Sequence, residues 1–140
     1  MEHYTLVIRS SKRSYGATND FHIDCGQFFQ NFNGRTLNGK LVSWVFPNDT
    51  GDDSNTTDKS LQIKVDLHLP HQTDTDNEGM QTIAVLSNND KSIRSIQQGH
   101  DFTCVVPNGN VLHFRIENAS SEALAEDVEE NILVLQFTPM

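Results

Sequence analysis

Apolar and polar residues alternate without a break over residues 61–69, and Pro70 ends the run. In a β-strand successive side chains point to opposite faces, so the alternation predicts one apolar face and one polar face. On a helix the same residues would scatter around the cylinder. We expect a strand of an antiparallel sheet that packs on a second sheet, with its polar face in water or against another subunit. The polar face consists of Gln62, Lys64, Asp66 and His68.

Further β-prone runs follow at a regular spacing, and turn chemistry separates them. Asn-Gly pairs at residues 33–34 and 38–39 predict tight turns. Pro-Asn-Gly at residues 107–109 predicts a hairpin between its flanking runs. The expected strands lie at residues 4–9, 21–25, 41–46, 61–69, 81–86, 102–106, 111–116 and 131–138.

About eight strands without a long helix predict an all-β protein. We expect a single antiparallel two-sheet sandwich, jelly-roll-like, that forms one domain over residues 1–140. Ile93 and Ile96 fit either a short helical turn or an extended segment, and the acidic stretch 120–130 permits a short helix. The sequence does not determine the order of the strands.

Charge and the lengths of apolar runs argue against two classes of partner. Nineteen acidic residues face ten basic ones, for a net charge of -9, which disfavours binding to a phosphate backbone. The longest unbroken apolar runs have four residues, too few to cross a membrane. The start of the chain has no secretory signal pattern, so we expect a protein made in the cytoplasm of its cell and not secreted.

Two cysteines and one acidic loop are the candidates for covalent or metal chemistry. Cys25 and Cys104 each lie in an apolar-alternating segment, where they are either buried thiols or partners in a disulfide. Asp74, Asp76 and Glu78 match the first oxygen positions of a calcium loop, but Val85 stands where the closing Glu is needed. We expect a solvated loop, with these three residues as weak calcium candidates and no bound cofactor.

Catalytic motifs are absent from the sequence. It contains no Gly-x-Ser-x-Gly and no phosphate-binding Gly-rich loop before a helix, and it lacks the His-x-His pair of the cupin metalloenzymes. We therefore expect no enzymatic activity. Trp44 is expected in the core, with a sugar-stacking role as the alternative. The cluster of Phe28, Phe29 and Phe32 is either core beneath a crossover or an apolar patch that docks a partner.

The first segments of the chain resemble the start of small β-sandwich virion proteins of large double-stranded DNA viruses and their relatives. The C-terminal layout is similar too, with a hairpin at residues 107–109, an acidic loop and a closing apolar strand. Lys12 departs from the acidic residue that the family pattern has at this place. The resemblance is carried by the spacing Tyr4-x-Leu6-x-Ile8-x-Ser10-Ser11-x-Arg13-x-x-Gly16-x-Thr18-x-x-Phe21.

The resemblance implies a minor capsid, cement or vertex protein of a virion. Such a protein acts through homo-oligomerisation, as a trimer or pentamer, and through contacts with other capsid proteins. The resemblance implies no catalytic residues. The alternative hypothesis is a ligand-binding β-sandwich, such as a calcium-assisted carbohydrate-binding module that uses the loop at Asp74, Asp76 and Glu78. A cupin-type metalloenzyme is a third hypothesis.

Overall fold

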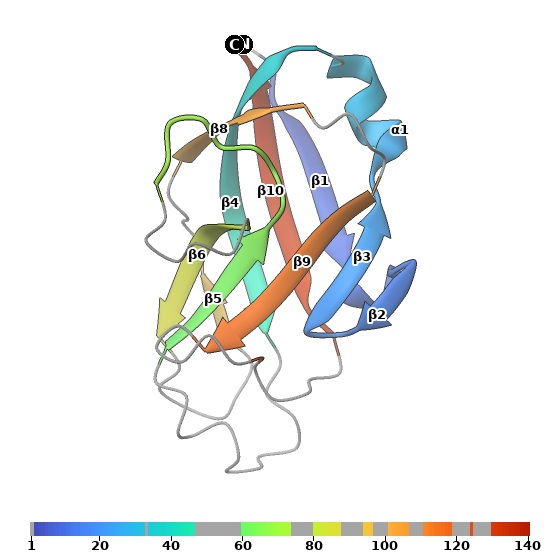
Figure 1. Cartoon of the computed structure of the whole chain (residues 1–140), viewed down its shortest axis with the longest axis vertical. Helices are drawn as coiled ribbons and strands as arrows, with labels where there is room; N and C mark the ends of the chain where they lie inside the picture. Colours follow the sequence, from blue (N-terminus) through green and yellow to red (C-terminus); the bar gives the residue numbers. More distant parts are fainter. Residues whose placement is uncertain are drawn as a thin grey trace.

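A computed structural model shows two antiparallel β-sheets packed face to face (Figure 1). The structure describes residues 2–32, 34–46, 60–73, 80–87, 94–96, 101–106, 111–118, 124 and 130–140. Sheet A contains, in spatial order, β1 (Tyr4–Arg9), β10 (Ile132–Pro139), β4 (Thr36–Phe46) and β7 (Arg94–Ile96), and β8 (Asp101–Val105) also pairs with β4. Sheet B contains β2 (Tyr15–Ala17), β3 (Asp20–Asp24), β9 (Val111–Asn118), β5 (Ser60–Val65) and β6 (Gln81–Ser87).

The strand pairs nest within one another along the chain. β1 pairs with β10, β3 with β9, β4 with β8, and β5 with β6, as in one long antiparallel hairpin. This hairpin is rolled so that successive pairs enter opposite sheets, and the contacts of β10 with β4 and of β9 with β5 complete the two sheets. This winding is a jelly roll, so the predicted all-β two-sheet sandwich is confirmed.

Short helical turns connect some of the strands. The 3-10 turn η1 (Ser10–Lys12) follows β1, and α1 (Gly26–Phe29) with η2 (Gln30–Phe32) lies between β3 and β4. Ile96 lies in the strand β7, so the extended conformation, and not the short helical turn, is correct at this residue. The predicted helix at 120–130 lies mostly outside the described residues, of which Leu124 forms an isolated bridge with Glu117. Within the described chain, no helix is long and apolar enough to cross a membrane.

Local differences from the predicted strands have clear physical reasons. Gly34 has a positive φ of 78°, as a turn requires, whereas Gly39 lies inside β4. The reason is a close approach, because a Cβ at Gly39 would lie 2.4 Å from the ring of Phe102. The run at 61–69 leaves sheet B after Val65, and His68 then bridges to Val105 in sheet A.

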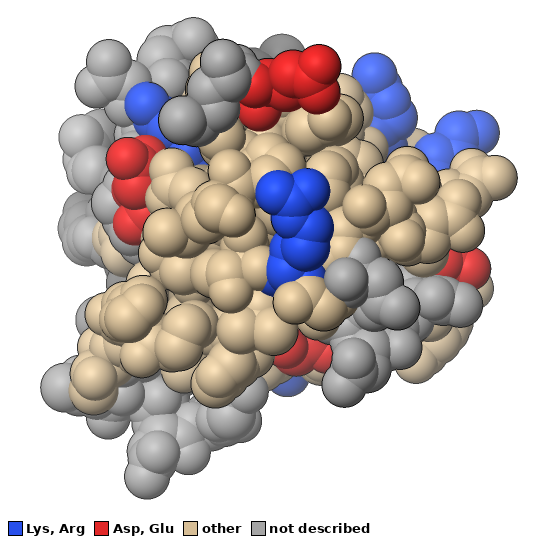
Figure 2. Space-filling view, turned by 90° about the horizontal axis from the view of Figure 1, so that it is seen from above, with Lys and Arg blue, Asp and Glu red and all other residues tan. Residues whose placement is uncertain are grey.

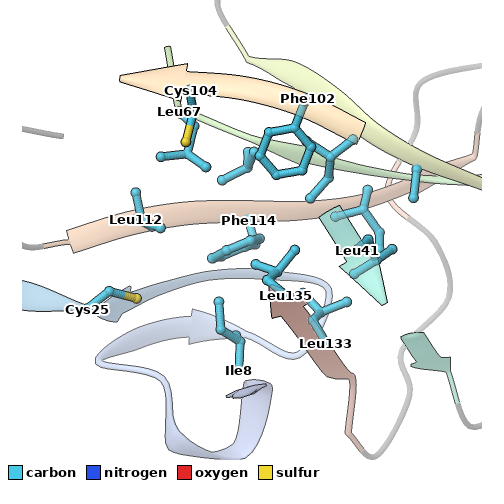
Figure 3. Close-up of a cluster of buried hydrophobic side chains, with 14 of the residues drawn as sticks. Ile8, Cys25, Leu41, Leu67, Phe102, Cys104, Leu112, Phe114, Leu133 and Leu135 are labelled. Atoms are coloured by element: carbon cyan, nitrogen blue, oxygen red, sulfur yellow. The ribbon is translucent and has the colours of Figure 1, made fainter. Parts of the chain in front are cut away.

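The hydrophobic core fills the space between the two sheets (Figure 3). Ile8, Leu41, Leu133 and Leu135 of sheet A face Phe114 of sheet B, and all five are at most 1% exposed. Trp44 is fully buried, and its Nε1 donates a hydrogen bond of 3.1 Å to Asn131 Oδ1. The expectation of a buried Trp44 is therefore confirmed, and its ring is not available for sugar stacking.

Both cysteines are free thiols in this core, so the disulfide alternative is wrong. Figure 3 shows the two side chains apart, with Leu67 beside Cys104 and with Leu112 drawn between the two cysteines. Burial raises the pKa of the Cys104 thiol to about 12. Burial, and then the carboxylates of Asp24 and Asp66, raise the pKa of Cys25 to about 12 as well. Both groups are therefore protonated at neutral pH.

We predict that native Cys25 and Cys104 resist alkylation at pH 8. The thiolate is the nucleophile, and a pKa of about 12 leaves very little of it. Mass spectrometry after iodoacetamide treatment should show unmodified protein in buffer and two adducts in denaturant. Rapid double modification of the folded protein would contradict the buried placement of both thiols.

Candidate interaction surfaces

The motif behind the family resemblance forms the corner between β1 and sheet B. The Ser10 amide donates to the Asn131 carbonyl at 3.0 Å, and the Asn131 amide donates to Ser10 Oγ at 2.8 Å. Arg13 donates from Nε to the Gly16 carbonyl at 2.8 Å and from a terminal nitrogen to the Ser10 carbonyl at 2.9 Å. Phe21 is fully buried. These motif residues thus have a structural role: they hold the corner together through hydrogen bonds and a buried ring.

The face of sheet B that points away from the core carries a continuous set of polar and aromatic side chains. Cross-strand neighbours form rows, because β2, β3, β9 and β5 lie side by side in a fixed register. We call this set the polar row. It consists of Tyr15, Asp20, His22, Gln62, Lys64, His113, Arg115 and Glu117.

Glu117 is the centre of a buried charge cluster within the polar row. Its Oε1 accepts from Gln62 Nε2 at 2.9 Å and lies 3.6 Å from Lys64 Nζ, and its Oε2 accepts from Arg115 Nε at 2.9 Å. Glu117 is 0% exposed and Lys64 is 1% exposed, although both lie on the outer face. The expectation of a solvated polar face is therefore wrong for Gln62 and Lys64, and it is correct for Asp66 and His68, which are exposed.

A stack of three rings crosses the other end of the polar row. Tyr15 stacks on His22 with ring centroids 4.2 Å apart, and His22 stacks on His113 at 4.0 Å. His113 Nε2 contacts Asp20 Oδ1 at 2.5 Å, and Asp20 also pairs with Arg115 at 3.4 Å. His22 Nδ1 is buried and has no hydrogen-bond partner among the described residues. The stack joins β2, β3 and β9.

A groove opens beside β1, at the margin of the sandwich. Its volume is about 440 Å³, and the inward side chains of β1 form one wall while α1 and η2 form the other. We call it the β1 edge groove. Its lining combines apolar side chains with amides and one carboxylate. The lining residues are Tyr4, Leu6, Asp24, Cys25, Gln27, Phe28, Asn31 and Phe32.

The outer face of sheet A carries an apolar strip. Val7 of β1 lies opposite Val134 of β10, and Ile132 of β10 lies opposite Val45 of β4. Val7 is 45% exposed and the other three are half-buried. We call these four residues the outer strip. Of these four residues only Val7 is exposed, so the strip is a small apolar area on the outer face of sheet A.

The phenylalanine cluster divides between the core and the β1 edge groove. Phe29 and Phe32 are 3% and 4% exposed and belong to the core, so the docking alternative is wrong for Phe29. Phe28 is partly buried, packs against Phe29, Phe32 and Phe137, and lines the groove. Phe32 reaches the groove through an edge contact with Tyr4 at 4.9 Å.

The calcium candidates Asp74, Asp76 and Glu78 lie outside the described residues. Within the described ranges, no group of three or more His, Cys, Asp or Glu side chains could hold a metal ion. Charged residues are also dispersed: on the end of the molecule seen in Figure 2, basic side chains stand apart with acidic ones among them. The view shows no gathered basic patch on that face.

The ring stack and the buried charge cluster were not foreseen from the sequence. Tyr15, His22 and His113 are separated along the chain and meet only through the register of three strands. A usable signal was the alternation in residues 111–116, which places His113 and Arg115 on one face. The neighbours of that face depend on strand order, which the sequence left open.

Comparisons with known proteins do not place the chain in a family. No family model matches the chain, and no curated protein matches it. Among solved structures, the chain is similar to a cryo-EM structure of a virus-like particle of the extra small virus of the giant freshwater prawn Macrobrachium rosenbergii. The two share 7% identity at a TM-score of 0.29, over 97% of this chain and 78% of that chain. Similarity at this level shows no shared function.

Proposed function

We propose that the protein is a non-enzymatic structural component of a virion, such as a minor capsid, cement or vertex protein. It acts through self-association and through contacts with other capsid proteins. The outer strip carries this proposal. Covering the exposed Val7 and its half-buried neighbours with a partner removes apolar surface from water, which lowers the free energy of the complex. Jelly rolls commonly build shells, which supports the virion assignment together with the N-terminal resemblance. Fold alone does not determine function, so the surface argument is needed.

We predict that the purified protein forms a closed symmetric oligomer that depends on the outer strip. Val134→Lys should shift the mass measured by light scattering towards the monomer, because it places a charge in the buried contact. Val85→Lys is the matched control, since Val85 is 59% exposed on the edge strand β6 of the other sheet. A wild-type protein that stays monomeric and does not co-sediment with virion particles would overturn the proposal.

A further inference from the structure

We propose that the β1 edge groove binds an extended peptide segment of another protein, which adds a strand to sheet A beside β1. The segment carries apolar side chains at alternate positions and a Lys or Arg at its flanks. This inference goes beyond a structural role in a virion, since it assigns a peptide-binding site to each single chain. Three features of the described residues support it: backbone groups, a side-chain pocket and local charge.

The backbone of β1 presents unused hydrogen-bonding groups at the edge of sheet A. The Ser10 amide donates to the Asn131 carbonyl, and this pair continues the register of β1 with β10. Bonding alternates along an antiparallel pair, so the even residues of β1 bond to β10. Thr5 and Val7 therefore direct their N–H and C=O groups away from β10, where no described strand pairs with them.

The β1 edge lacks several of the usual features that prevent strand addition. Natural proteins protect edge strands with proline, lysine, bulges or very short length. β1 has six residues without proline or lysine, and its register along β10 is regular. By contrast, the sheet B edge strand β2 has three residues, and β6 contains a register shift along β5.

The pocket of the groove lies on the inner side of the same edge. Tyr4 and Leu6, which point inwards from β1, are only half-buried, and Phe28 lies across the groove from them. An added strand would direct alternate side chains towards these apolar side chains and its other side chains towards solvent. Backbone bonds then supply affinity, and the groove selects apolar residues at every second position.

The charge around the groove specifies the partner further. Asp24 lines it, Asp66 acts electrostatically on the neighbouring Cys25, and the Tyr4 hydroxyl donates to the Glu2 carboxylate. Arg35 is the basic group that acts on Tyr4. The Asp24 carboxylate in the lining, on a chain of net charge -9, favours a segment with basic flanks. It also disfavours a second copy of this chain, which carries the same net negative charge.

The test uses a labelled, acetylated and amidated peptide of sequence Lys-Thr-Leu-Thr-Phe-Thr-Lys. At ten times its Kd the peptide should slow amide hydrogen exchange at Thr5 and Val7 by about tenfold, since exchange then requires dissociation. The even residues of β1 already bond to β10 and should change little. A peptide with Glu in place of both Lys residues should bind more weakly. The readout is amide exchange in β1, which does not require self-association, so a failure of self-association leaves this test intact.

Two variants separate the backbone and charge contributions. Val7→Pro removes an outward N–H at an edge position and should weaken binding about tenfold, whereas Val7→Thr keeps the N–H and should weaken binding far less than Val7→Pro. Asp24→Asn keeps an acceptor for the Gly26 amide, which Asp24 Oδ1 binds at 2.8 Å, and should reduce the preference for the Lys peptide. Asp101→Asn, on an exposed residue of β8, is its control.

Three outcomes would overturn the proposal. The first is unchanged exchange at Thr5 and Val7 in millimolar Lys peptide. The second is full affinity in a Val7→Pro protein that melts cooperatively. The third is equal affinity for the Lys and Glu peptides in wild type, which would remove the charge argument that defines the partner. If Val7→Pro does not fold, the exchange experiment and Asp24→Asn decide the question without it.

Discussion

Replacing Glu117 with alanine is expected to lower the free energy of unfolding by about 3–5 kcal/mol. The carboxylate is fully buried and contacts Gln62, Lys64 and Arg115. Its removal takes a nearby counter-charge from the buried ammonium of Lys64, so less of the desolvation cost of that ammonium is offset. Equilibrium denaturation in urea, followed by circular dichroism, measures the change.

The comparison variants identify charge burial as the cause. Lys64→Met leaves Glu117 with its contacts to Arg115 and Gln62 and should cost less than Glu117→Ala. The double variant Lys64→Met with Glu117→Leu should recover part of the loss, because it removes the buried charge of Lys64 together with that of Glu117, while Gln62 and Arg115 still lose their acceptor. Glu2→Ala is the exposed control and should stay within about 0.5 kcal/mol of wild type. A Glu117→Ala loss as small as that of Glu2→Ala would refute the buried-cluster account.

The buried cluster also shows where sequence patterning stops being informative. Alternation over 61–69 correctly places Leu61, Ile63 and Val65 in the core, because the direction of a strand side chain is a local property. Whether the opposite face is exposed to solvent depends on which other parts of the chain pack over it. Lys64 occupies a polar position of the alternating run and is nevertheless 1% exposed. The hydrophobic pattern of its own segment could not predict that burial.

Strand order imposes the same limit on the candidate surfaces. The sandwich class followed from the number of β-prone runs, but the β1 edge groove exists only because β1 ends one sheet while α1 follows β3 in the other. Phe28, Phe29 and Phe32 form one cluster in sequence, yet only Phe28 is half-exposed beside the groove. Their division depends on how α1 and η2 sit against Phe137 of β10.

The two Asn-Gly pairs differ in how well they predict structure: one correctly indicates a turn conformation, and the other marks a position of close packing instead of a turn. The Asn-Gly pair at 33–34 predicts a positive φ, and Gly34 has one. The identical pair at 38–39 lies inside β4. Gly39 leaves room there for the ring of Phe102, which belongs to the neighbouring strand β8 but is far away in the sequence. The same dipeptide therefore serves two purposes, and only long-range contacts distinguish them.

Gly16→Ala is expected to destabilise the protein by about 2–4 kcal/mol, through backbone strain and a steric clash together. Gly16 has a φ of 106°, a conformation that alanine adopts at a cost. An added Cβ would also lie 2.3 Å from the Asp20 carbonyl oxygen and 2.9 Å from the Phe21 Cα, both of them backbone atoms. Neither atom can move without displacing β3, whose outer face carries the ring stack.

Gly34→Ala is the matched control, since Gly34 has a φ of 78° but no atom within 4 Å of an added Cβ. It should cost only the conformational strain, about 1–2 kcal/mol, so the difference between the two variants isolates the clash. Urea denaturation of both proteins measures that difference, and the amide exchange of Ser14, which donates to the His22 carbonyl at 2.7 Å, reports displacement of β3. Equal losses with unchanged Ser14 exchange would contradict the steric account. The glycine of the N-terminal motif would then be explained by its φ alone.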